Sequence, residues 1–374
     1  MKVAIVAPLV SAIREPQGGG SQAFVSDLAR GLVSRGHQVH VYAATGSEIP
    51  GVTVIDTGVD PRSLAATLYR AADYRAAGYR AADPSGRDSA LAASAFARAY
   101  SAVRQTRYDV IHNHAFDAPA IGLATRLTTP VVHTLHLPPD GAVAASLSRA
   151  ARGSQPPAVA CVSEFQASTW RAVTRVDAIL PPYVPTRSVP WSVATGSGAV
   201  FGGRLSPEKG AAEAIDIARA AGARIDVYGD VYDAQYAREQ IGPRRDLPGV
   251  AVHRGIARTA MWAAMARAAV VICPAKWDEP FGMAAADAHA CGTPVVAFRR
   301  GGLGEIIEDG VTGFLVEPDD IQAAADSVRK ATQISRAACR GHAEMHLDLE
   351  RSLDVHEHLY RRVTSRRAGT EAHE

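Results

Sequence analysis

One stretch of this chain, Asp278 to Gly313, constrains the fold more than any other part of the sequence. Within it, Met283 to Ala290 is a run of strong helix formers, and Gly292 supplies the left-handed conformation that ends many helices. The next segment, Thr293 to Phe298, is β-branched and apolar, which predicts a buried parallel strand. A helix followed by such a strand and a glycine-rich loop indicates an α/β fold.

Two acidic residues flank the start of this helix. Glu279 lies just before it, and Asp287 follows after seven intervening residues, about two turns into the helix. The helix start near Gly282 presents unpaired backbone N–H groups and a positive dipole end, which together bind anions. A diphosphate bound there would have a carboxylate on either side, and each carboxylate can accept hydrogen bonds from hydroxyl groups. The arrangement predicts a nucleotide-sugar site.

The same stretch resembles the E-x7-E signature of retaining glycosyltransferases of family 4 type with the GT-B fold, with Asp287 in place of the second glutamate. The alternative is a helix, strand and glycine loop from an unrelated α/β protein. The resemblance implies two Rossmann-like domains with a cleft between them and a C-terminal helix that crosses back. It also implies that Glu279 binds the donor sugar and that Asp287 binds the ribose. Three further residues at the nucleotide would be Phe281, Gly282 and Met283.

Length and composition are those of a globular protein with two domains. The chain has 374 residues, of which 47% are hydrophobic and 21% charged. A formal net charge of +2 does not indicate a nucleic-acid partner. Four cysteines without CxxC spacing predict neither a disulfide framework nor a zinc site.

Apolar runs are shorter than a membrane span, and the apolar start of the chain contains Pro8, so we expect a first strand and a cytoplasmic protein.

A glycine loop follows the first predicted strand, Lys2 to Pro8, and opens a helix that ends before the next strand, Gln38 to Ala43. This βαβ opening lacks the GxGxxG fingerprint, so a dinucleotide-binding domain is not indicated. Glycosyltransferases of family 4 type carry a similar loop close to the donor phosphates. The resemblance implies that role for Gly19 and Gly20.

Histidines lie at the ends of two predicted strands. One strand, Tyr108 to His112, leads into His114, and a second, starting at Pro130, ends in His136. The carboxyl ends of parallel strands line the crevice where α/β proteins bind ligands. A single histidine is more often structural, but DVIHNH resembles the family's D-V-x-H-x-H, whose second histidine contacts the transferred sugar. The resemblance implies a catalytic role for His114, with His136 and Thr134 on the acceptor side.

A segment rich in Pro, Ser and Gly, from Pro181 to Ser197, predicts a linker between the domains. A new βαβ pattern starts at Ala199. We therefore predict an N-terminal acceptor-binding domain made of residues 1–183 and the C-terminal helix 347–374. A donor-binding domain would comprise residues 198–346.

The sequence GGRLSPEKG after the strand at Ala199 resembles a family element in which Arg and Lys clamp the diphosphate. A leaving diphosphate gains negative charge, and Arg204 with Lys209 can stabilise that charge without a metal. The alternative is a pair of solvated loop residues. The resemblance adds Glu208 to this donor site and places the nucleobase near Arg254. One departure is the turn at Gly229, which reads GDV in place of the family's G-x-G, so the nucleobase stays open.

These observations predict a hexosyltransferase that moves a sugar, with retention, from a nucleotide-sugar donor to a small soluble acceptor. A UDP-sugar is favoured, and no metal or other cofactor, nucleic acid or particular oligomer is expected. The alternatives are a GT-B-type UDP-sugar epimerase, a glycosyltransferase with a lipid acceptor at the membrane surface, and a catalytically inactive nucleotide-sugar-binding protein. The presence of Arg204, Lys209 and Glu279 argues against the inactive protein.

An Ala-rich repeat at 69–83 predicts a solvated helix. Similarity to glycosyltransferases that decorate bacterial natural products favours a soluble acceptor.

Overall fold

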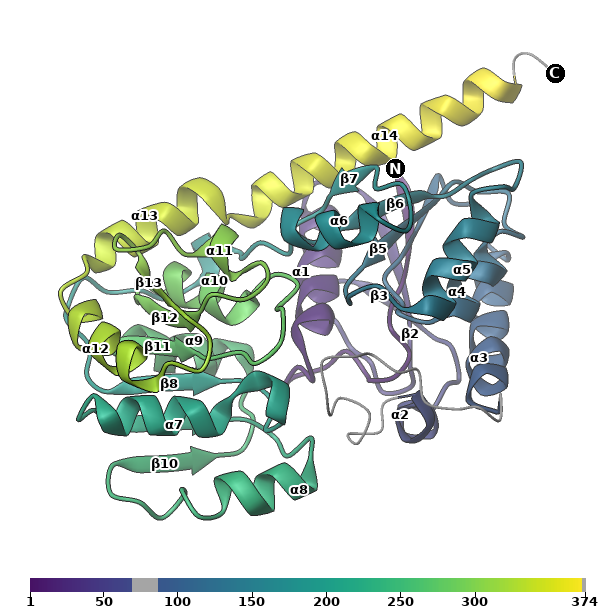
Figure 1. The fold of residues 1–374 in the computed structure, drawn as a ribbon. Helices are drawn as coiled ribbons and strands as arrows, with labels where there is room; N and C mark the ends of the chain where they lie inside the picture. Colours follow the sequence, from purple (N-terminus) through teal and green to yellow (C-terminus); the bar gives the residue numbers. More distant parts are fainter. Residues whose placement is uncertain (69–86, 372–374) are drawn as a thin grey trace. The chain divides into compact units, whose positions relative to one another are not determined.

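The computed structural model of the chain describes residues 1–68 and 87–371 (Figure 1). The helix expected over 69–83 lies outside the described residues. The chain forms two compact units. Unit 1 comprises Met1–Arg14, Gly20–Pro182 and Leu349–Glu374, and unit 2 comprises Glu15–Gly19 and Tyr183–Asp348. The short segment Glu15–Gly19 lies within the expected N-terminal domain in sequence but packs with unit 2.

Among the described residues, unit 1 contains a parallel sheet of seven strands in the order β3-β2-β1-β4-β5-β6-β7. The strand order reverses between β1 and β4, which is the Rossmann-like arrangement. The strands are β1 (Lys2–Val6), β2 (Gln38–Ala43), β3 (Thr53–Asp56), β4 (Val110–Asn113), β5 (Val131–Leu135), β6 (Ala158–Cys161) and β7 (Ala178–Ile179).

Helices pack on this sheet through buried apolar side chains such as Phe24, Phe96 and Trp170. They are α1 (Gly20–Ser34), α2 (Pro61–Leu68), α3 (Arg87–Val103), α4 (Ala118–Ala124), α5 (Gly141–Ala150), α6 (Glu164–Arg171) and α14 (Leu349–Glu371). The C-terminal helix α14 lies against α1 so closely that a Cβ atom at Gly31 would be 2.7 Å from the Leu353 side chain. Arg35, the residue that follows α1, also pairs with Glu350 of α14 at 2.6 Å. The last helix of the chain is therefore part of the first unit's packing.

Unit 2 repeats the same arrangement. Its parallel sheet has the order β10-β9-β8-β11-β12-β13, which reverses between β8 and β11. The strands are β8 (Ala199–Gly202), β9 (Ile225–Tyr228), β10 (Val250–His253), β11 (Val270–Cys273), β12 (Val295–Phe298) and β13 (Gly313–Val316). The helical segments are η1 (Thr186–Ser188), η2 (Pro207–Lys209), α7 (Ala211–Ala220), α8 (Ala234–Tyr236), η3 (Ala237–Ile241), α9 (Arg258–Arg267), α10 (Met283–Ala290), α11 (Leu303–Ile306), α12 (Ile321–Ala331) and α13 (Arg336–His346).

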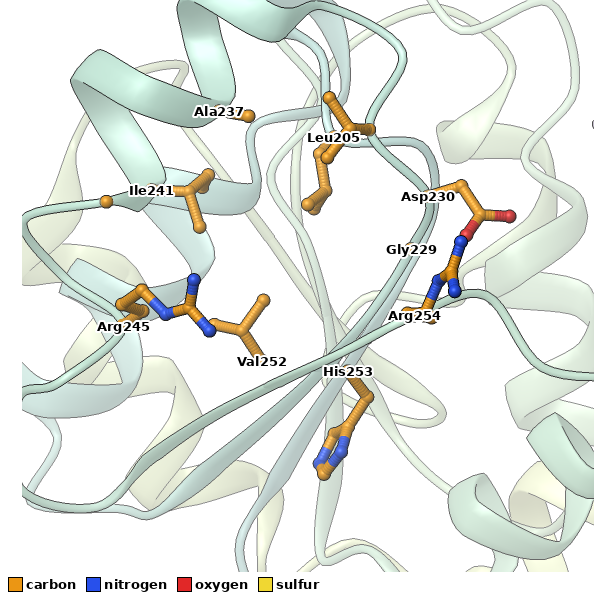
Figure 2. Close-up of a pocket in the computed structure, with 11 residues that line it drawn as sticks. Leu205, Gly229, Asp230, Ala237, Ile241, Arg245, Val252, His253 and Arg254 are labelled. Carbon is orange, nitrogen blue, oxygen red and sulfur yellow. The ribbon is translucent and has the colours of Figure 1, made fainter.

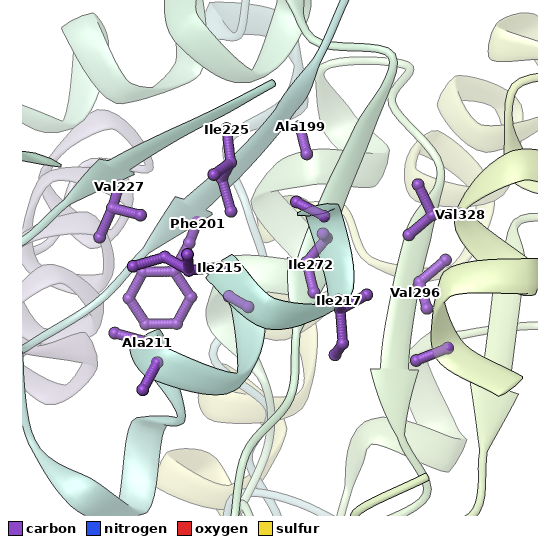
Figure 3. Close-up of a cluster of buried hydrophobic side chains, with 14 of the residues drawn as sticks. Ala199, Phe201, Ala211, Ile215, Ile217, Ile225, Val227, Ile272, Val296 and Val328 are labelled. Carbon is purple, nitrogen blue, oxygen red and sulfur yellow. The ribbon is translucent and has the colours of Figure 1, made fainter. Parts of the chain in front are cut away.

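The core of unit 2 lies between the sheet and the helices α7 and α12. Figure 3 shows Phe201 and Ile225 of the sheet near Ile215 of α7, and Val328 of α12 near Val296. These side chains are at most 4% exposed. The apolar central strands β8, β11 and β12 are thus buried on both faces of the sheet, whereas the edge strand β10 is only partly buried.

Two buried arginines of α13 hold the segment expected to be the linker against unit 2. Arg336 Nε donates to the Ser192 carbonyl at 2.8 Å, and Arg340 Nη2 donates to the Thr186 carbonyl at 2.8 Å. Arg340 Nη1 donates to the Val189 carbonyl at 3.2 Å. A guanidinium group buried among carbonyl oxygens satisfies several backbone acceptors of an irregular segment at once. The segment after Tyr183 is therefore an ordered part of unit 2.

Candidate functional site

The topology of unit 2 brings distant loops together at one point. Because the strand order reverses between β8 and β11, the loops after these two strands leave the sheet in opposite directions and open a crevice at its carboxyl edge. The loop after β8 carries Arg204 and Lys209, and the loop after β11 carries Glu279. Three of the residues that the sequence singles out for the donor site therefore lie at the place where an α/β sheet binds ligands.

Lys209 and Glu279 form an ion pair in this crevice. The Lys209 Nζ atom lies 2.9 Å from Oε1 and 2.8 Å from Oε2 of Glu279. Trp277 Nε1 donates to Glu279 Oε2 at 2.6 Å, and the Lys209 ammonium lies 4.8 Å from the centre of the Trp277 ring. The two charged side chains stay partly exposed, at 22% and 18%. A cation and a carboxylate are thus fixed next to each other at the surface, where one can meet phosphate and the other hydroxyl groups.

Two glycines allow the loops to pack this closely. Gly210 has a φ of 73°, and a Cβ atom there would lie 2.1 Å from the Pro274 carbonyl oxygen at the end of β11. Gly301 has a φ of 59°, and a Cβ atom there would lie 2.2 Å from the Glu279 carbonyl oxygen. The neighbouring Gly302 N–H donates to that same oxygen at 2.7 Å. The glycine loop after β12 therefore supports the backbone of Glu279.

Arg204 lies between a carboxylate and an aromatic ring. Its Nη2 atom donates to Glu208 Oε1 at 3.2 Å, and its guanidinium carbon lies 4.4 Å from the centre of the Tyr232 ring. Glu208 is 6% exposed and also accepts a hydrogen bond from Ser206 Oγ at 2.7 Å. These contacts orient Arg204 while 29% of its side chain stays exposed. Glu208 therefore contacts Arg204 from a buried position.

Helix α10 begins at Met283, directly after Gly282. The backbone N–H groups of its first turn are therefore where the sequence predicts the anion site. Phe281 is buried, and its ring centre lies 6.0 Å from that of Tyr183. Asp287 lies in the second turn, as expected from the sequence. Its carboxylate accepts hydrogen bonds from Arg258, a residue that the sequence did not single out.

A cavity of about 460 Å³ opens at the carboxyl ends of β9 and β10 (Figure 2). Its apolar wall includes Leu205 and Val252, and its polar wall includes Asp230, Arg245 and Arg254. Figure 2 shows Arg254 extending toward Asp230. Asp230 Oδ1 accepts a hydrogen bond from the backbone N–H of Gly255 at 3.2 Å. Arg254 therefore lines a pocket of unit 2, next to the turn where the sequence departs from the family pattern.

Unit 1 has its own reversal point, between β1 and β4, and His114 follows β4 there. His114 Nδ1 lies 3.0 Å from His136 Nε2, so the two histidines named from the sequence are in contact. His114 is fully buried, whereas His136 is half-buried. Thr134 is also buried, and its Oγ1 atom lies 2.6 Å from Nε2 of His112, whose ring is next to that of His114.

Burial keeps these imidazoles neutral. It lowers the pKa of His114 well below its usual value, with a further contribution from the neighbouring histidines, and lowers the pKa of His136 to about 3. Within the part of the chain that the structure describes, His114 Nε2 is a buried atom with no hydrogen-bond partner. The Nε2 atom of a neutral imidazole donates or accepts one hydrogen bond, depending on the tautomer.

The two glycines expected near the phosphates are consecutive residues in different units. Gly19 ends the segment that packs with unit 2, and Gly20 is the first residue of α1 in unit 1. Glu15, in the same short segment as Gly19, accepts a hydrogen bond from the Arg258 backbone N–H at 2.9 Å.

The sequence analysis did not identify three residues that contact the expected site residues: Trp277 contacts Glu279, Tyr232 contacts Arg204, and Arg258 contacts Asp287. Trp277 had a local signal, since it lies two residues before Glu279. The other two contacts join residues from different elements or loops, distant in the sequence, and had no local signal. Over residues 1–68 and 87–371, no group of His, Cys, Asp and Glu is arranged to hold a metal, and no helix is long and apolar enough to cross a membrane.

Comparisons with known proteins agree with this geometry. The family described as Glycosyl transferases group 1 matches residues 197–342, and Glycosyltransferase Family 4 matches residues 18–187. Two relatives are the D-inositol 3-phosphate glycosyltransferases of Kribbella flavida and Acidothermus cellulolyticus, which are 27% and 28% identical. The alignments cover 87% and 85% of this chain and 86% and 80% of the relatives.

Solved structures of similar fold cover almost the whole chain. AviGT4, a glycosyltransferase involved in avilamycin A biosynthesis, superposes with a TM-score of 0.69 at 22% identity, over 98% of both chains. Sucrose-phosphate synthase from Thermosynechococcus elongatus gives 0.75 at 18% identity, over 98% of this chain and 99% of the other. Anabaena HepE in complex with UDP and glucose gives 0.69 at 21% identity, over 96% and 99%.

Proposed function

Because the chain belongs to the glycosyltransferases of family 4 type with the GT-B fold and is a hexosyltransferase, we propose that it transfers a hexose from a UDP-sugar to a small soluble acceptor with retention of configuration. We further propose that the reaction takes place in the cytoplasm and needs no metal ion. The observation that carries the proposal is the Lys209–Glu279 pair at the reversal point of the unit 2 sheet, beside Arg204 and the start of α10.

The chemistry follows from what these groups can stabilise. When the bond between the sugar's anomeric carbon and UDP breaks, negative charge develops on the diphosphate, and Lys209 and Arg204 stabilise it. The N–H groups at the start of α10 add to this stabilisation. Glu279 accepts hydrogen bonds from the sugar's hydroxyls and holds the reacting carbon in place. A new bond to the acceptor oxygen forms on the same face, and the acceptor's proton moves to the leaving phosphate.

In the proposal, Asp287 and the cavity beside Arg254 bind the nucleoside. The choice of UDP is supported by HepE, whose structures hold UDP and UDP-glucose, and by TarM of S. aureus, whose structure holds UDP. Starch Synthase IV from Arabidopsis thaliana is bound to ADP, so the fold itself does not select the base. A panel of nucleotides is therefore part of the test.

The choice of a small soluble acceptor is supported by the relatives named for D-inositol 3-phosphate, a small polar molecule. AviGT4, which takes part in avilamycin A biosynthesis, supports it as well. Neither name points to an acceptor embedded in a membrane. Relatives named as transferases also disfavour a UDP-sugar epimerase.

The test has two stages. Thermal unfolding with UDP, GDP, ADP and dTDP should show the largest rise in midpoint with UDP, because a ligand that binds the folded state stabilises it by mass action. UDP-glucose is then incubated with D-inositol 3-phosphate and other polar acceptors, and the anomeric configuration of the product is read by NMR. An α-linked product indicates retention. A β-linked product, or an altered UDP-sugar formed without acceptor, would overturn the proposed reaction.

Metal dependence is tested in the same assay. Activity should persist after treatment with EDTA, because Lys209 and Arg204 supply the positive charge that a divalent cation provides elsewhere. The control is the same protein with added Mg²⁺. A rate that is lost in EDTA and restored by Mg²⁺ would show that the two cationic side chains are insufficient.

A further inference from the structure

Asp287 is the point at which this chain departs from the family's second glutamate, and its carboxylate is in contact with Arg258. Arg258 Nη2 donates to Oδ1 of Asp287 at 2.9 Å, and Nε donates to Oδ2 at 3.3 Å. Two parallel hydrogen bonds of this kind fix a carboxylate in both position and plane. Each side chain is only 10% exposed, so water screens the pair weakly.

Arg258 is itself held in place. It is the first residue of α9, and its backbone N–H donates to Glu15 Oε2 at 2.9 Å. Its guanidinium group lies 4.8 Å from the centre of the Trp262 ring, one turn further along α9. Arg258 is thus held at its backbone by Glu15, at the face of its guanidinium group by Trp262, and at its guanidinium nitrogens by Asp287. A side chain with these three contacts has little freedom to move when a ligand binds.

We propose that Arg258 is the positioning residue for ribose recognition: it holds the shorter Asp287 carboxylate in the orientation that binds the ribose hydroxyls. An ionised carboxylate has about four acceptor positions, and Arg258 occupies one on each oxygen. The remaining positions accept hydrogen bonds from the 2′- and 3′-hydroxyls. The inference rests on the proposed function, since it takes Asp287 to lie at the nucleoside, and it predicts that Arg258 sets the discrimination between ribose and deoxyribose.

The experiment compares UDP with 2′-deoxy-UDP by isothermal titration calorimetry. Wild-type protein should bind UDP about tenfold more tightly, the ratio expected for one hydrogen bond to a charged group. Arg258→Lys keeps the charge but cannot form the planar double contact. It should reduce the ratio to within about threefold, chiefly by weakening UDP, because only UDP carries the 2′-hydroxyl.

Arg244→Lys is the matched control. Arg244 makes the same double contact elsewhere in unit 2, with Nε at 3.0 Å and Nη2 at 2.8 Å from the Asp216 carboxylate. This variant should keep the wild-type ratio. Arg258→Gln is a second test variant, and because the ratio compares two ligands on one protein, a lower stability of either variant does not disturb it.

The outcomes separate the inference from the proposed function. A wild-type ratio near one, or an unchanged ratio in Arg258→Lys and Arg258→Gln, overturns the role of Arg258 while UDP binding still supports a UDP-sugar transferase. Absence of binding by wild-type protein to either nucleotide overturns both. Loss of discrimination in the Arg258 variants, with retention in Arg244→Lys, supports the inference.

Discussion

At the scale of single residues, the proposed donor site contains a cation, Lys209, that the fold holds beside the carboxylate of Glu279. Lys209→Ala should lower kcat/KM on the order of a hundredfold, which corresponds to about 3 kcal/mol of lost transition-state stabilisation. The reason is that the variant lacks the positive charge that stabilises the developing diphosphate anion. Lys330→Ala, at an exposed position of α12, is the control and should stay within about twofold of wild type. Steady-state kinetics measures both. Comparable rates for the two variants would mean that Lys209 does not act on the diphosphate.

His114 allows a second prediction at this scale. His114→Ala should lower turnover by roughly tenfold or more, because a neutral imidazole contacting the sugar contributes one oriented hydrogen bond to the transition state. The affinity for UDP should stay nearly constant, because the charged side chains proposed to bind the nucleotide, Arg204, Lys209 and Asp287, are all in unit 2. Kinetics and calorimetry separate the two effects. Unchanged turnover would leave His114 as a structural partner of His136.

At the scale of elements, the glycine loop after β12 supports the loop of Glu279. Gly301→Ala should lower both the stability of unit 2 and the activity, because the new Cβ would meet a backbone oxygen that cannot move without shifting Glu279. Gly310→Ala is the control: its φ of 78° is equally unusual, but a Cβ there meets nothing within 4 Å. That control should cost only about 1–2 kcal/mol of backbone strain and keep its activity. Equal activity losses in both variants would argue against the contact with Glu279.

At the scale of the whole molecule, unit 1 buries several histidines in neutral form. Burial lowers the pKa of His133 to about 3 and that of His356 to about 4, and it lowers the pKa of His112 well below its usual value. Each of these groups binds a proton near pH 6.5 in the unfolded chain but not in the folded protein. Asp117 has the opposite effect, because burial raises its pKa to about 7. The histidines outnumber it.

The free energy of unfolding should therefore fall as the pH is lowered from about 7 toward 4.5, by up to about 1.4 kcal/mol per pH unit for each buried histidine. Urea unfolding at several pH values measures the slope. His356→Phe removes one titrating ring from the packing between α1 and α14. The free energy of unfolding of this variant should therefore change less per pH unit, by about the contribution of one histidine. A stability that does not change between pH 7 and 5 would contradict the neutral histidine cluster.

The α/β class, the two Rossmann-like units and the family were predicted from the sequence alone, and these predictions are confirmed. Local signals were strong next to a glycine that ends a helix, as at Gly292 and Gly36. The helix Met283–Ala290 and the strand Gln38–Ala43 therefore have the predicted bounds. Strand β3 was not predicted, because its four residues, Thr53–Asp56, are at most half-buried and lack a long apolar run.

The contacts between side chains that are distant in the sequence became visible in the folded structure. Lys209 and Glu279 are 70 residues apart, and Arg258 and Asp287 are 29 apart. Each pair is joined by strand order and by close backbone packing, not by spacing along the chain. A sequence pattern reports the local periodicity of one element, whereas the contact between two loops depends on which strands are neighbours in the sheet. For that reason the residue types of the site could be read from the sequence, but the partner that holds Asp287 could not.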